Sequence, residues 1–569
     1  MNTLEALRHS TAHVLASAIR ELYPKARLAI GPSIDEGFYY DFDNLDISEN
    51  DLPKIEKKMQ EIISNKLDFK KSSKTYQEAK KLLKDEPYKI ELLEELKKNK
   101  ETITFYQNGS FMDLCAGPHI KNTSDIKAFK LLRLAGAYWK GDSKNKMLTR
   151  IYGTSFQSKK ELDDYLKLRE EAEKRDHRKL GVQLDLYEFK EESPGSPFFY
   201  PKGTVIYNAL KDFMAREYRK RGYQEVITPL LYDKSLWEKS GHWKHFKDDM
   251  FILNIDNKEF ALKPMNCPSH VLIYSSRLRS YKDLPLRIAD FAPLHRNELR
   301  GVLGGLTRVR KFSQDDAHIF CTEEQIEQEV TNVIDFINYI YKDVFKFEYS
   351  VELSTKPEKA MGEAKLWNKA EAILKNILEK KKIKFRINPG EGAFYGPKID
   401  LHIKDAIGRS HQLATVQLDF QMPSSFNITY EGSDGKKHTP IMIHRAIFGS
   451  IERFIGILIE HYSGNMPLWL NPVQVKLLTF TDRNRKYAEK ILNELVDSDL
   501  RVELDDRNET VNKKVFDAQA QKTNYIVTVG DKEEKANTLA VRSRDGKVKF
   551  GVKPDDFIKQ LQKEIKEKA

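Results

Sequence analysis

The spacing of apolar side chains along the chain predicts helices and strands in successive blocks. In residues 4–22, apolar side chains recur on one side at about 100° per residue, which predicts an amphipathic helix. A charged helical pattern follows at residues 51–100, and residues 102–112 have the pattern of a strand. The highly charged stretch at residues 159–179 predicts a linker helix exposed to solvent.

A second block begins near residue 185, where a Ser-Pro-Gly-Ser-Pro sequence predicts a loop. A helix is expected at residues 205–221, and strand-like runs occur at residues 225–229, 251–253 and 415–420. This mixture is typical of an antiparallel sheet with helices alongside it, so we expect an α+β domain.

A third block follows Pro472, in which strands and helices alternate. The pattern predicts strands at residues 473–480, 501–504 and 525–529, separated by helices at residues 485–496 and 513–522. This βαβαβ order indicates a small α/β domain.

The length of the chain agrees with several domains. Its 569 residues are too many for a single core, and roughly two to four domains are expected. We therefore predict an α+β multidomain protein with an α+β N-terminal domain, an antiparallel-sheet core and a C-terminal α/β domain. The expected divisions are residues 1–158, a linker helix at residues 159–184, residues 185–471 and residues 472–569.

Charge and cysteine content narrow the environment of the protein. A formal net charge of +11 suits an anionic partner such as a nucleic acid, although a general preference for lysine explains it equally well. Cys115, Cys267 and Cys321 are odd in number and far apart, which favours a reducing compartment. No apolar run approaches the roughly 20 residues that span a bilayer, and no signal peptide is visible at residues 1–10. We therefore expect a cytoplasmic protein without a membrane segment.

A first candidate site combines two histidines with a later cysteine and histidine. His9 and His13 are four residues apart, so they share one helix face, roughly opposite the apolar one. Cys115 and His119 lie on a turn that contains Gly-Pro. Together they form a possible zinc set or hydrolytic cluster, and the alternative is a group of surface histidines.

The sequences around these residues resemble the second editing domain of threonyl-tRNA synthetases, which is related to that of alanyl-tRNA synthetases. The resemblance rests on Arg-His-Ser-x-Ala-His at residues 8–13, Gly-Phe-Tyr-Tyr-Asp at residues 37–41 and Cys-x-Gly-Pro-His at residues 115–119. It implies hydrolysis of serine from threonine tRNA, either with a metal or with an activated water alone. The implied editing residues are His9, His13, Cys115, His119, Tyr40, Lys89 and Asp113.

The middle block resembles the catalytic core of class II tRNA synthetases. Motif 1 would end at Pro229, residues 296–312 resemble motif 2, and Gly-Ser-Ile-Glu-Arg at residues 449–453 resembles motif 3. An isolated Arg-x-Glu, as at residues 296–298, is weak evidence for motif 2. Its position before Arg453, in the order and spacing of class II enzymes, makes it informative.

The class II resemblance implies how ATP is held. Negative charge develops on the α-phosphate and on pyrophosphate, and arginines with Mg²⁺ stabilise that charge. Arg296 is implied at the α-phosphate, and Arg308 and Arg453 at the other phosphates. Glu298 would read the adenine amino group and Phe312 would stack on the ring, although an aromatic residue there is otherwise a core residue.

The resemblance to threonyl-tRNA synthetases also supplies a zinc site. It implies Cys267, His318 and His444 as three ligands of one zinc per subunit, with an open position. The amino and hydroxyl groups of threonine would coordinate the metal, so valine would be rejected by roughly 10⁴ to 10⁵ and serine by only about 10 to 200. An editing site is the expected remedy. Further implied residues are Asp316, Tyr395 and Gln314 at threonine, Lys398 in catalysis, Gln412 at ATP, and His242 and Gln417 as weaker candidates.

The third block resembles the anticodon-binding domain of several class II enzymes, with Asn508, Glu533 and Arg542 at base-reading positions. Threonine tRNA, ATP and L-threonine are the implied partners, in a homodimer. Relatives commonly begin with a ubiquitin-like domain, which this sequence is expected to lack. A regulatory protein without aminoacylation and a prolyl or alanyl synthetase are the alternatives. The presence of the motif 2 and 3 residues argues against the first, and the zinc set argues against the second.

Overall fold

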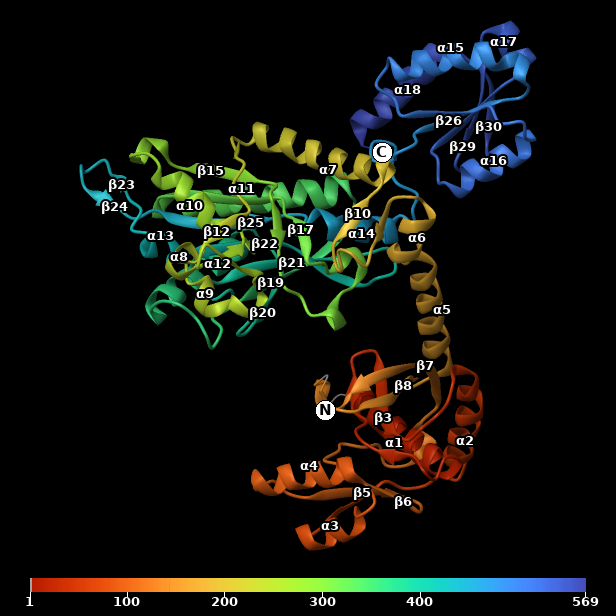
Figure 1. The fold of residues 1–569 in the computed structure, drawn as a ribbon, viewed down its shortest axis with the longest axis vertical. Helices are drawn as coiled ribbons and strands as arrows, with labels where there is room; N and C mark the ends of the chain where they lie inside the picture. Colours follow the sequence, from red (N-terminus) through yellow and green to blue (C-terminus); the bar gives the residue numbers. More distant parts are fainter. Residues whose placement is uncertain (1–2, 143, 569) are drawn as a thin grey trace. The chain divides into compact units, whose positions relative to one another are not determined.

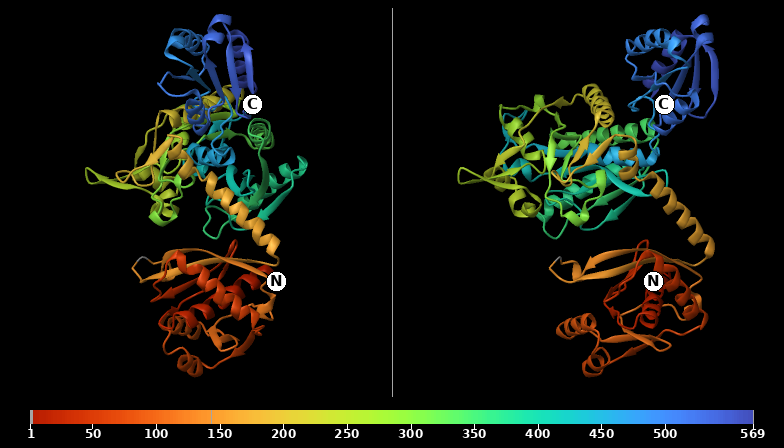
Figure 2. Two further views of the ribbon diagram at one scale, coloured as in Figure 1. Left: turned by 90° about the vertical axis from the view of Figure 1, so that its right-hand side faces the viewer. Right: turned by 45° about the vertical axis from the view of Figure 1, so that its right-hand side comes forward.

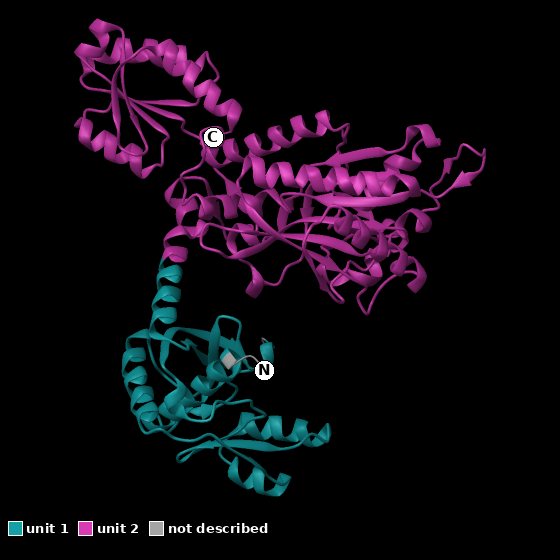
Figure 3. Cartoon of the chain, turned by 180° about the vertical axis from the view of Figure 1, so that it is seen from behind, with its two compact units in different colours: residues 1–170 teal, residues 171–569 magenta. Residues whose placement is uncertain are grey.

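The computed structural model describes residues 3–142 and 144–568, which form two compact units (Figure 3). The first unit is residues 1–170 and the second is residues 171–569. No helix in the described ranges has the length and apolar character that a bilayer crossing requires.

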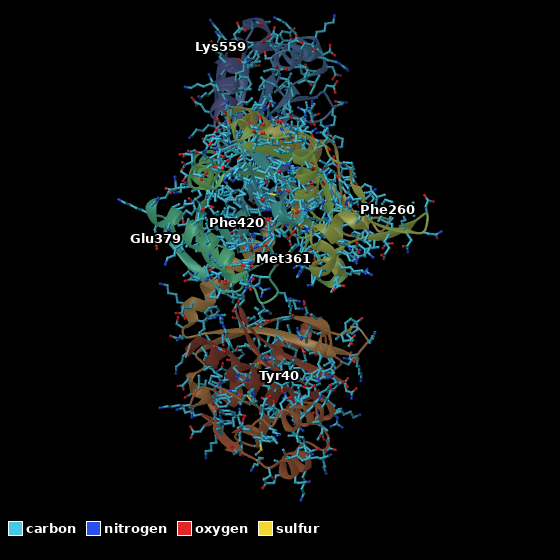
Figure 4. The ribbon with its side chains drawn as sticks, turned by 90° about the vertical axis from the view of Figure 1, so that its left-hand side faces the viewer. Tyr40, Phe260, Met361, Glu379, Phe420 and Lys559 are labelled. Carbon is cyan, nitrogen blue, oxygen red and sulfur yellow. The ribbon has the colours of Figure 1, made fainter. Side chains whose placement is uncertain are left out.

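The first unit begins with the predicted amphipathic helix, α1 (Thr3–Leu22). It packs against an antiparallel sheet, together with α2 (Leu52–Ser64). The strands follow the order β1 (Arg27–Leu28), β3 (Gly37–Asp43), β8 (Met147–Phe156), β7 (Ala128–Tyr138), with β2 (Ser33–Ile34) beside β3. Leu15, Phe38 and Ile151 belong to the core between these layers. Tyr40 lies inside this unit, among the side chains of its core (Figure 4).

A smaller sheet completes the first unit. Its strands are β4 (Lys70–Ser73), β5 (Thr104–Asn108) and β6 (Phe111–Leu114), covered by α3 (Tyr76–Leu82) and α4 (Pro87–Lys98). The stretch at residues 51–100, expected to be helical, therefore also contains a strand. The predicted strand at residues 102–112 is a hairpin of β5 and β6.

The expected linker helix at residues 159–179 is divided into α5 (Lys159–Arg175) and α6 (His177–Gln183). The Asp176 side chain accepts a hydrogen bond from the Arg178 backbone N–H at 2.9 Å. An aspartate that accepts in this way begins a new helix, which is why the single helix of the prediction is wrong.

The second unit is built on an eight-stranded, mainly antiparallel sheet, as the sequence predicts. The strand order is β11 (Gln224–Glu225), β15 (Leu286–Asp290), β18 (Asp316–Cys321), β25 (Ile441–Ala446), β22 (Ser410–Asp419), β21 (Lys398–Lys404), β19 (Glu348–Ser354), β20 (Phe385–Asn388). The helices that pack on it are α7 (Pro201–Lys220), α11 (Ile326–Asn338), α12 (Ala364–Lys380) and α14 (Ile451–His461). Cys321 is fully buried in this core.

Shorter elements surround this sheet. The predicted strand at residues 225–229 is shorter than expected, because only β11 pairs as a strand and Ile227 is 97% exposed. The shorter elements closest to the site are α8 (Lys234–Lys239), α9 (His242–His245), α10 (Cys267–Ser275), β12 (Leu231–Asp233), β13 (Ile252–Ile255), β14 (Lys258–Leu262), β16 (Pro293–His295) and β17 (Lys311–Ser313).

The C-terminal part has the predicted α/β alternation (blue in Figures 1 and 2). Its sheet has the order β27 (Val502–Asp505), β26 (Val475–Thr479), β28 (Tyr525–Val529), β29 (Leu539–Ser543), β30 (Val548–Val552). Helices α15 (Arg485–Val496) and α18 (Pro554–Glu567) share one core with the sheet, and α16 (Val511–Ala520) packs in a separate cluster. The short α17 (Asp531–Ala536) follows β28.

Candidate active sites

Two neighbouring strands and one helix bring the three predicted zinc ligands together. His318 in β18 lies directly opposite His444 in β25, and Cys267 is the first residue of α10. The distance from His318 Nε2 to His444 Nδ1 is 3.1 Å, and one ligand atom from each of the three residues lies within 4.8 Å of the others. Two nitrogens bound at about 2.0 Å to one tetrahedral ion are about 3.3 Å apart, so this donor set fits zinc.

Each histidine of this set is oriented by a second polar residue. His444 Nε2 lies 3.0 Å from Asp419 Oδ2, and His318 Nδ1 lies 2.8 Å from His270 Nδ1. Such partners fix the tautomer of a ligating histidine and leave its other nitrogen free for the metal. Burial raises the pKa of the Cys267 thiol and lowers that of His318, so burial favours the neutral form of both groups.

A cavity of about 330 Å³ opens beside this cluster. Asn266 Nδ2 donates to Asp316 Oδ2 at 3.1 Å, and Tyr395 donates to Gln417 Oε1 at 2.6 Å while its ring stacks on His444. The cavity therefore brings metal-binding, acidic and basic groups to one place. Residues singled out from the sequence that line it are Cys267, Arg296, Gln314, Asp316, His318, Tyr395, Gln417 and His444.

His242 lies next to the zinc candidates, although it is absent from the cavity wall. Its Nε2 atom is 3.8 Å from Cys267 Sγ, and its Nδ1 atom is 2.8 Å from Ser240 Oγ. Complete burial, followed by repulsion from His444 and Arg296, lowers the pKa of His242 to about 3. A neutral imidazole is thus available beside the cavity.

The motif 2 residues lie on the hairpin of β16 and β17 and the loop between these strands. The Arg296 guanidinium lies 5.1 Å from the ring centre of Phe312 and 5.4 Å from that of Phe246. Arg308 forms an ion pair with Glu298 at 3.0 Å. Both residues predicted to contact adenine, Glu298 and Phe312, are therefore in contact with a motif 2 arginine.

Arg453, on α14, faces the same positively charged region. Burial lowers its pKa, and the positive charge of Arg308 lowers it further. The Arg453 Nε atom is buried and has no hydrogen-bond partner among the described residues. Arg308 and Arg453 therefore repel each other, and Arg453 has a donor without a partner among the described residues. An anion bound between them would relieve the repulsion and accept from this donor.

Lys398 and Gln412 do not line the cavity. Lys398 Nζ lies 2.9 Å from Asp400 Oδ2, and Gln412 Nε2 donates to Asp400 Oδ1 at 2.7 Å. Their roles in catalysis and at ATP stay predictions.

The predicted editing residues also converge, within the first unit. The Cys115 Sγ atom lies 3.3 Å from His9 Nε2 and 3.3 Å from His119 Nε2, and His13 belongs to the same candidate metal group. Both faces of α1 are buried, because the face with the histidines packs toward the Cys115 loop. Gly117 turns this loop with φ +79°, where a Cβ atom would lie 2.5 Å from the Tyr106 hydroxyl.

A buried ion pair supports the editing cluster. Tyr40 donates to Asp113 Oδ2 at 2.6 Å, and Lys89 Nζ lies 2.8 Å from Asp113. All three side chains are buried.

Burial controls the ionisation of the editing cluster. It raises the pKa of Cys115 to about 11 and lowers the pKa values of His9, His13 and His119. At neutral pH the site thus holds a thiol and neutral imidazoles, which can accept a proton from water.

The three residues predicted to read the anticodon are distributed over the C-terminal sheet. Asn508 and Glu533 follow the carboxyl ends of β27 and β28, whereas Arg542 pairs with Ile526 near the start of β28. Glu533 accepts from the Gly530 backbone N–H at 3.1 Å, and Arg542 donates to the Gly546 carbonyl at 2.8 Å. Their role in base recognition stays a prediction.

Several supporting residues are absent from the sequence prediction. His270 follows Cys267 by three positions on α10, and this spacing is a signal that sequence reasoning could have used. Asp419 offers no such signal, because its proximity to His444 arises from the pairing of β22 with β25. Ser10, which contacts His119 Nδ1 at 2.9 Å, lies within the histidine motif itself.

Three family models match the chain. The tRNA synthetase class II core domain (G, H, P, S and T) matches residues 251–462, and the anticodon binding domain matches residues 472–564. The threonyl and alanyl tRNA synthetase second additional domain matches residues 103–152. The fold and the site therefore define a class II tRNA synthetase.

Similar proteins identify the family within that class. The threonine–tRNA ligases of Clostridium tetani, Acetivibrio thermocellus and Thermotoga maritima are 53%, 52% and 50% identical over 99% of this chain, and the matches cover 88%, 89% and 88% of their lengths. The RNA binding domain of threonyl-tRNA synthetase from Cryptosporidium parvum has a TM-score of 0.67 and 43% identity, covering 68% of this chain and 98% of that one. The chain belongs to the threonine–tRNA ligase family.

Proposed function

We propose that the protein activates threonine with ATP, transfers it to the 3′ end of threonine tRNA and hydrolyses mischarged seryl-tRNA. The observation that carries this proposal is the cavity in which Asp316 and Arg296 adjoin the Cys267, His318 and His444 cluster. Metal ligands, an acidic group and a basic group thus surround a space suited to a small amino acid and an α-phosphate.

Cys267, His318 and His444 would hold one zinc ion, which supplies a Lewis-acidic open position to the amino and hydroxyl groups of threonine. Asp316 accepts from the amino group, and Tyr395 and Gln314 close the cavity around the side chain. Serine differs from threonine by one methyl group, so this site discriminates against serine by only about 10 to 200-fold.

The motif 2 and motif 3 arginines hold the phosphates of ATP. Arg296 stabilises charge on the α-phosphate, while Arg308 and Arg453 bind the outer phosphates with Mg²⁺. When ATP enters, the Arg308–Glu298 ion pair opens, so that Glu298 contacts the adenine amino group and Phe312 stacks on the ring. Lys398 and Gln412 approach ATP from the Asp400 side.

The first unit removes serine from threonine tRNA. A neutral imidazole of His9, His13 or His119 takes a proton from water as the oxygen attacks the ester carbonyl. The imidazolium then returns this proton to the tRNA 3′-terminal ribose oxygen, which leaves as a hydroxyl when its bond to the carbonyl carbon breaks. Asp113, held by Tyr40 and Lys89, and Cys115 shape this pocket.

The remaining proposals concern organisation. Residues 1–158 edit, residues 159–184 link, residues 185–471 catalyse, and residues 472–569 bind the anticodon through Asn508, Glu533 and Arg542. The protein is a cytoplasmic homodimer, and the exposed Ile227 beside β11 suits an interface of motif 1.

Pyrophosphate exchange with threonine, serine or valine, with zinc and after chelation, tests the proposal. We expect strong exchange with threonine, weaker exchange with serine, negligible exchange with valine, and loss of exchange after chelation. Preference for another amino acid, or activity indifferent to chelation, would contradict the assignment of the central site. A complete lack of exchange would favour the regulatory alternative.

A further inference from the structure

One buried histidine outside the cavity contacts both of the segments that carry the phosphate-facing arginines. His177 begins α6 and is 4% exposed. Its Nδ1 atom lies 2.6 Å from Glu460 Oε1, and Glu460 lies on α14, seven residues after Arg453. Its Nε2 atom accepts a hydrogen bond from the Leu306 backbone N–H at 3.0 Å, two residues before Arg308.

These contacts define the tautomer of the ring. An imidazole that accepts from the Leu306 N–H at Nε2 carries its proton on Nδ1 and donates it to the Glu460 carboxylate. Glu460 is in turn held by Arg409, through an ion pair to its second oxygen, and Arg409 contacts Asp405. The acceptor for Nδ1 is therefore fixed.

The loop is shaped to approach this ring closely. Gly305 has φ +60°, and a Cβ atom there would lie 2.4 Å from His177 Nε2. The turn closes on itself, because the Gly304 N–H donates to the Arg308 carbonyl at 3.1 Å and the Thr307 hydroxyl donates to the Gly304 carbonyl at 2.6 Å. Holding Leu306 consequently holds the backbone of Arg308.

The cluster of Asp176, His177 and Glu460 has the composition of a metal site, but its contacts argue for a different role. Both ring nitrogens of His177 already have partners within hydrogen-bond distance, one a carboxylate and the other a backbone N–H. Asp176 is used to cap α6. No ring nitrogen remains for an ion.

We infer that His177 is a positioning residue that sets the separation of Arg308 and Arg453 by joining the motif 2 turn to the motif 3 helix. This inference rests on the proposed function, because it assigns these two arginines to the phosphates of ATP. Arg308 already lowers the pKa of Arg453, so the two cations repel each other before ATP arrives. His177, which is neutral in this tautomer, joins the segments that carry Arg308 and Arg453. It thereby maintains an anion site that the repulsion between the two arginines would otherwise widen.

Two substitutions separate the halves of the bridge. His177→Asn places an amide near the position of Nδ1, where it can donate to Glu460 but cannot reach Leu306. His177→Gln places an oxygen near the position of Nε2, where it can accept from the Leu306 N–H. It loses the side-chain contact with Glu460, but the link to α14 persists, because the backbone N–H of residue 177 donates to Glu460 Oε1 at 3.2 Å. We expect the Asn variant to raise the KM for ATP by about tenfold, as loss of one buried hydrogen bond implies, with the KM for threonine within about twofold. The Gln variant recovers most of the ATP affinity.

Limited trypsin digestion provides a readout that does not depend on activity. Arg300 is exposed on the motif 2 loop, and we expect faster cleavage there in the Asn variant than in the wild type or the Gln variant. Equal ATP KM values and equal cleavage rates in both variants and the wild type would overturn the inference while leaving the proposed function intact. If the wild type fails to exchange pyrophosphate, the proposed function fails, and the cleavage rates still decide whether His177 holds the loop.

Discussion

We expect the affinity of the proposed zinc site to depend on the contact between one buried oxygen of Asp419 and the ring of His444. Asp419 Oδ2 lies 3.0 Å from His444 Nε2, while Asp419 Oδ1 accepts from the backbone N–H groups of Gln421 and Met422. In Asp419→Asn the side-chain oxygen retains the backbone contacts, and the new NH₂ group faces His444 Nε2. Because two donors cannot pair, the ring must move its proton to Nδ1, the atom that faces His318.

The expected result is a loss of zinc affinity of about 10 to 100-fold, or about 1.4 to 2.7 kcal/mol, as for other partners that orient a metal-bound histidine. Competition against a chromogenic chelator measures this affinity directly, without relying on activity. Asp405→Asn is a matched control, since Asp405 is also buried and lies 3.1 Å from a histidine, His411, that is not a zinc candidate. Zinc affinity of the Asp419 variant within about twofold of the wild type would refute this reasoning.

Three further predictions concern the other sites. Lys89→Met should lower the melting temperature of the first unit, because it leaves the buried Asp113 charge unpaired at a cost of about 3 to 5 kcal/mol. Lys140→Met removes an ion pair on the surface and should change the melting temperature little. Equal melting temperatures of the two variants would argue against a stabilising role for the buried pair. Arg453→Gln should raise the KM for ATP about tenfold or more while leaving the KM for threonine nearly unchanged, and parallel rises in both KM values would contradict its assignment to a phosphate. Burial lowers the pKa values of His9, His13 and His119, so the rate of seryl-tRNA hydrolysis should stay nearly constant from about pH 7.5 to about pH 6, where an unperturbed histidine would retain only about a quarter of its base form. A fall centred near pH 6.5 would show that the base is an exposed histidine.

Local sequence patterns predict the helices and strands that bury one face against a single hydrophobic core. The helix at residues 485–496 and the strand at residues 525–529 have the predicted boundaries, because each buries a regular set of side chains. The linker at residues 159–179 was predicted as one helix, since a charged exposed stretch has no apolar period to reveal a break. The break depends on one hydrogen bond to Asp176, which a period cannot indicate.

The candidate sites were predictable to the extent that a family motif contains them. Cys267 and His444 are far apart in the sequence, and only the pairing of strands and the position of α10 bring them together, so spacing alone could not have joined them. His177, by contrast, could be found only from the structure. It lies outside the motif 2 and motif 3 sequences, and its importance arises from the approach of a glycine turn and of α14 from separate parts of the chain.

The location of the editing cluster in the first unit has a consequence for synthesis of the protein. His9, His13, Cys115 and His119 all lie within the first compact unit, whereas the Cys267, His318 and His444 set is incomplete until residue 444 has been made. Domains generally fold as units while the chain is still growing, starting from the N-terminus. During translation, the proposed hydrolytic centre can therefore be complete before the proposed activating centre exists. With these assignments, a nascent chain need not gain the capacity to mischarge tRNA before the capacity to correct it.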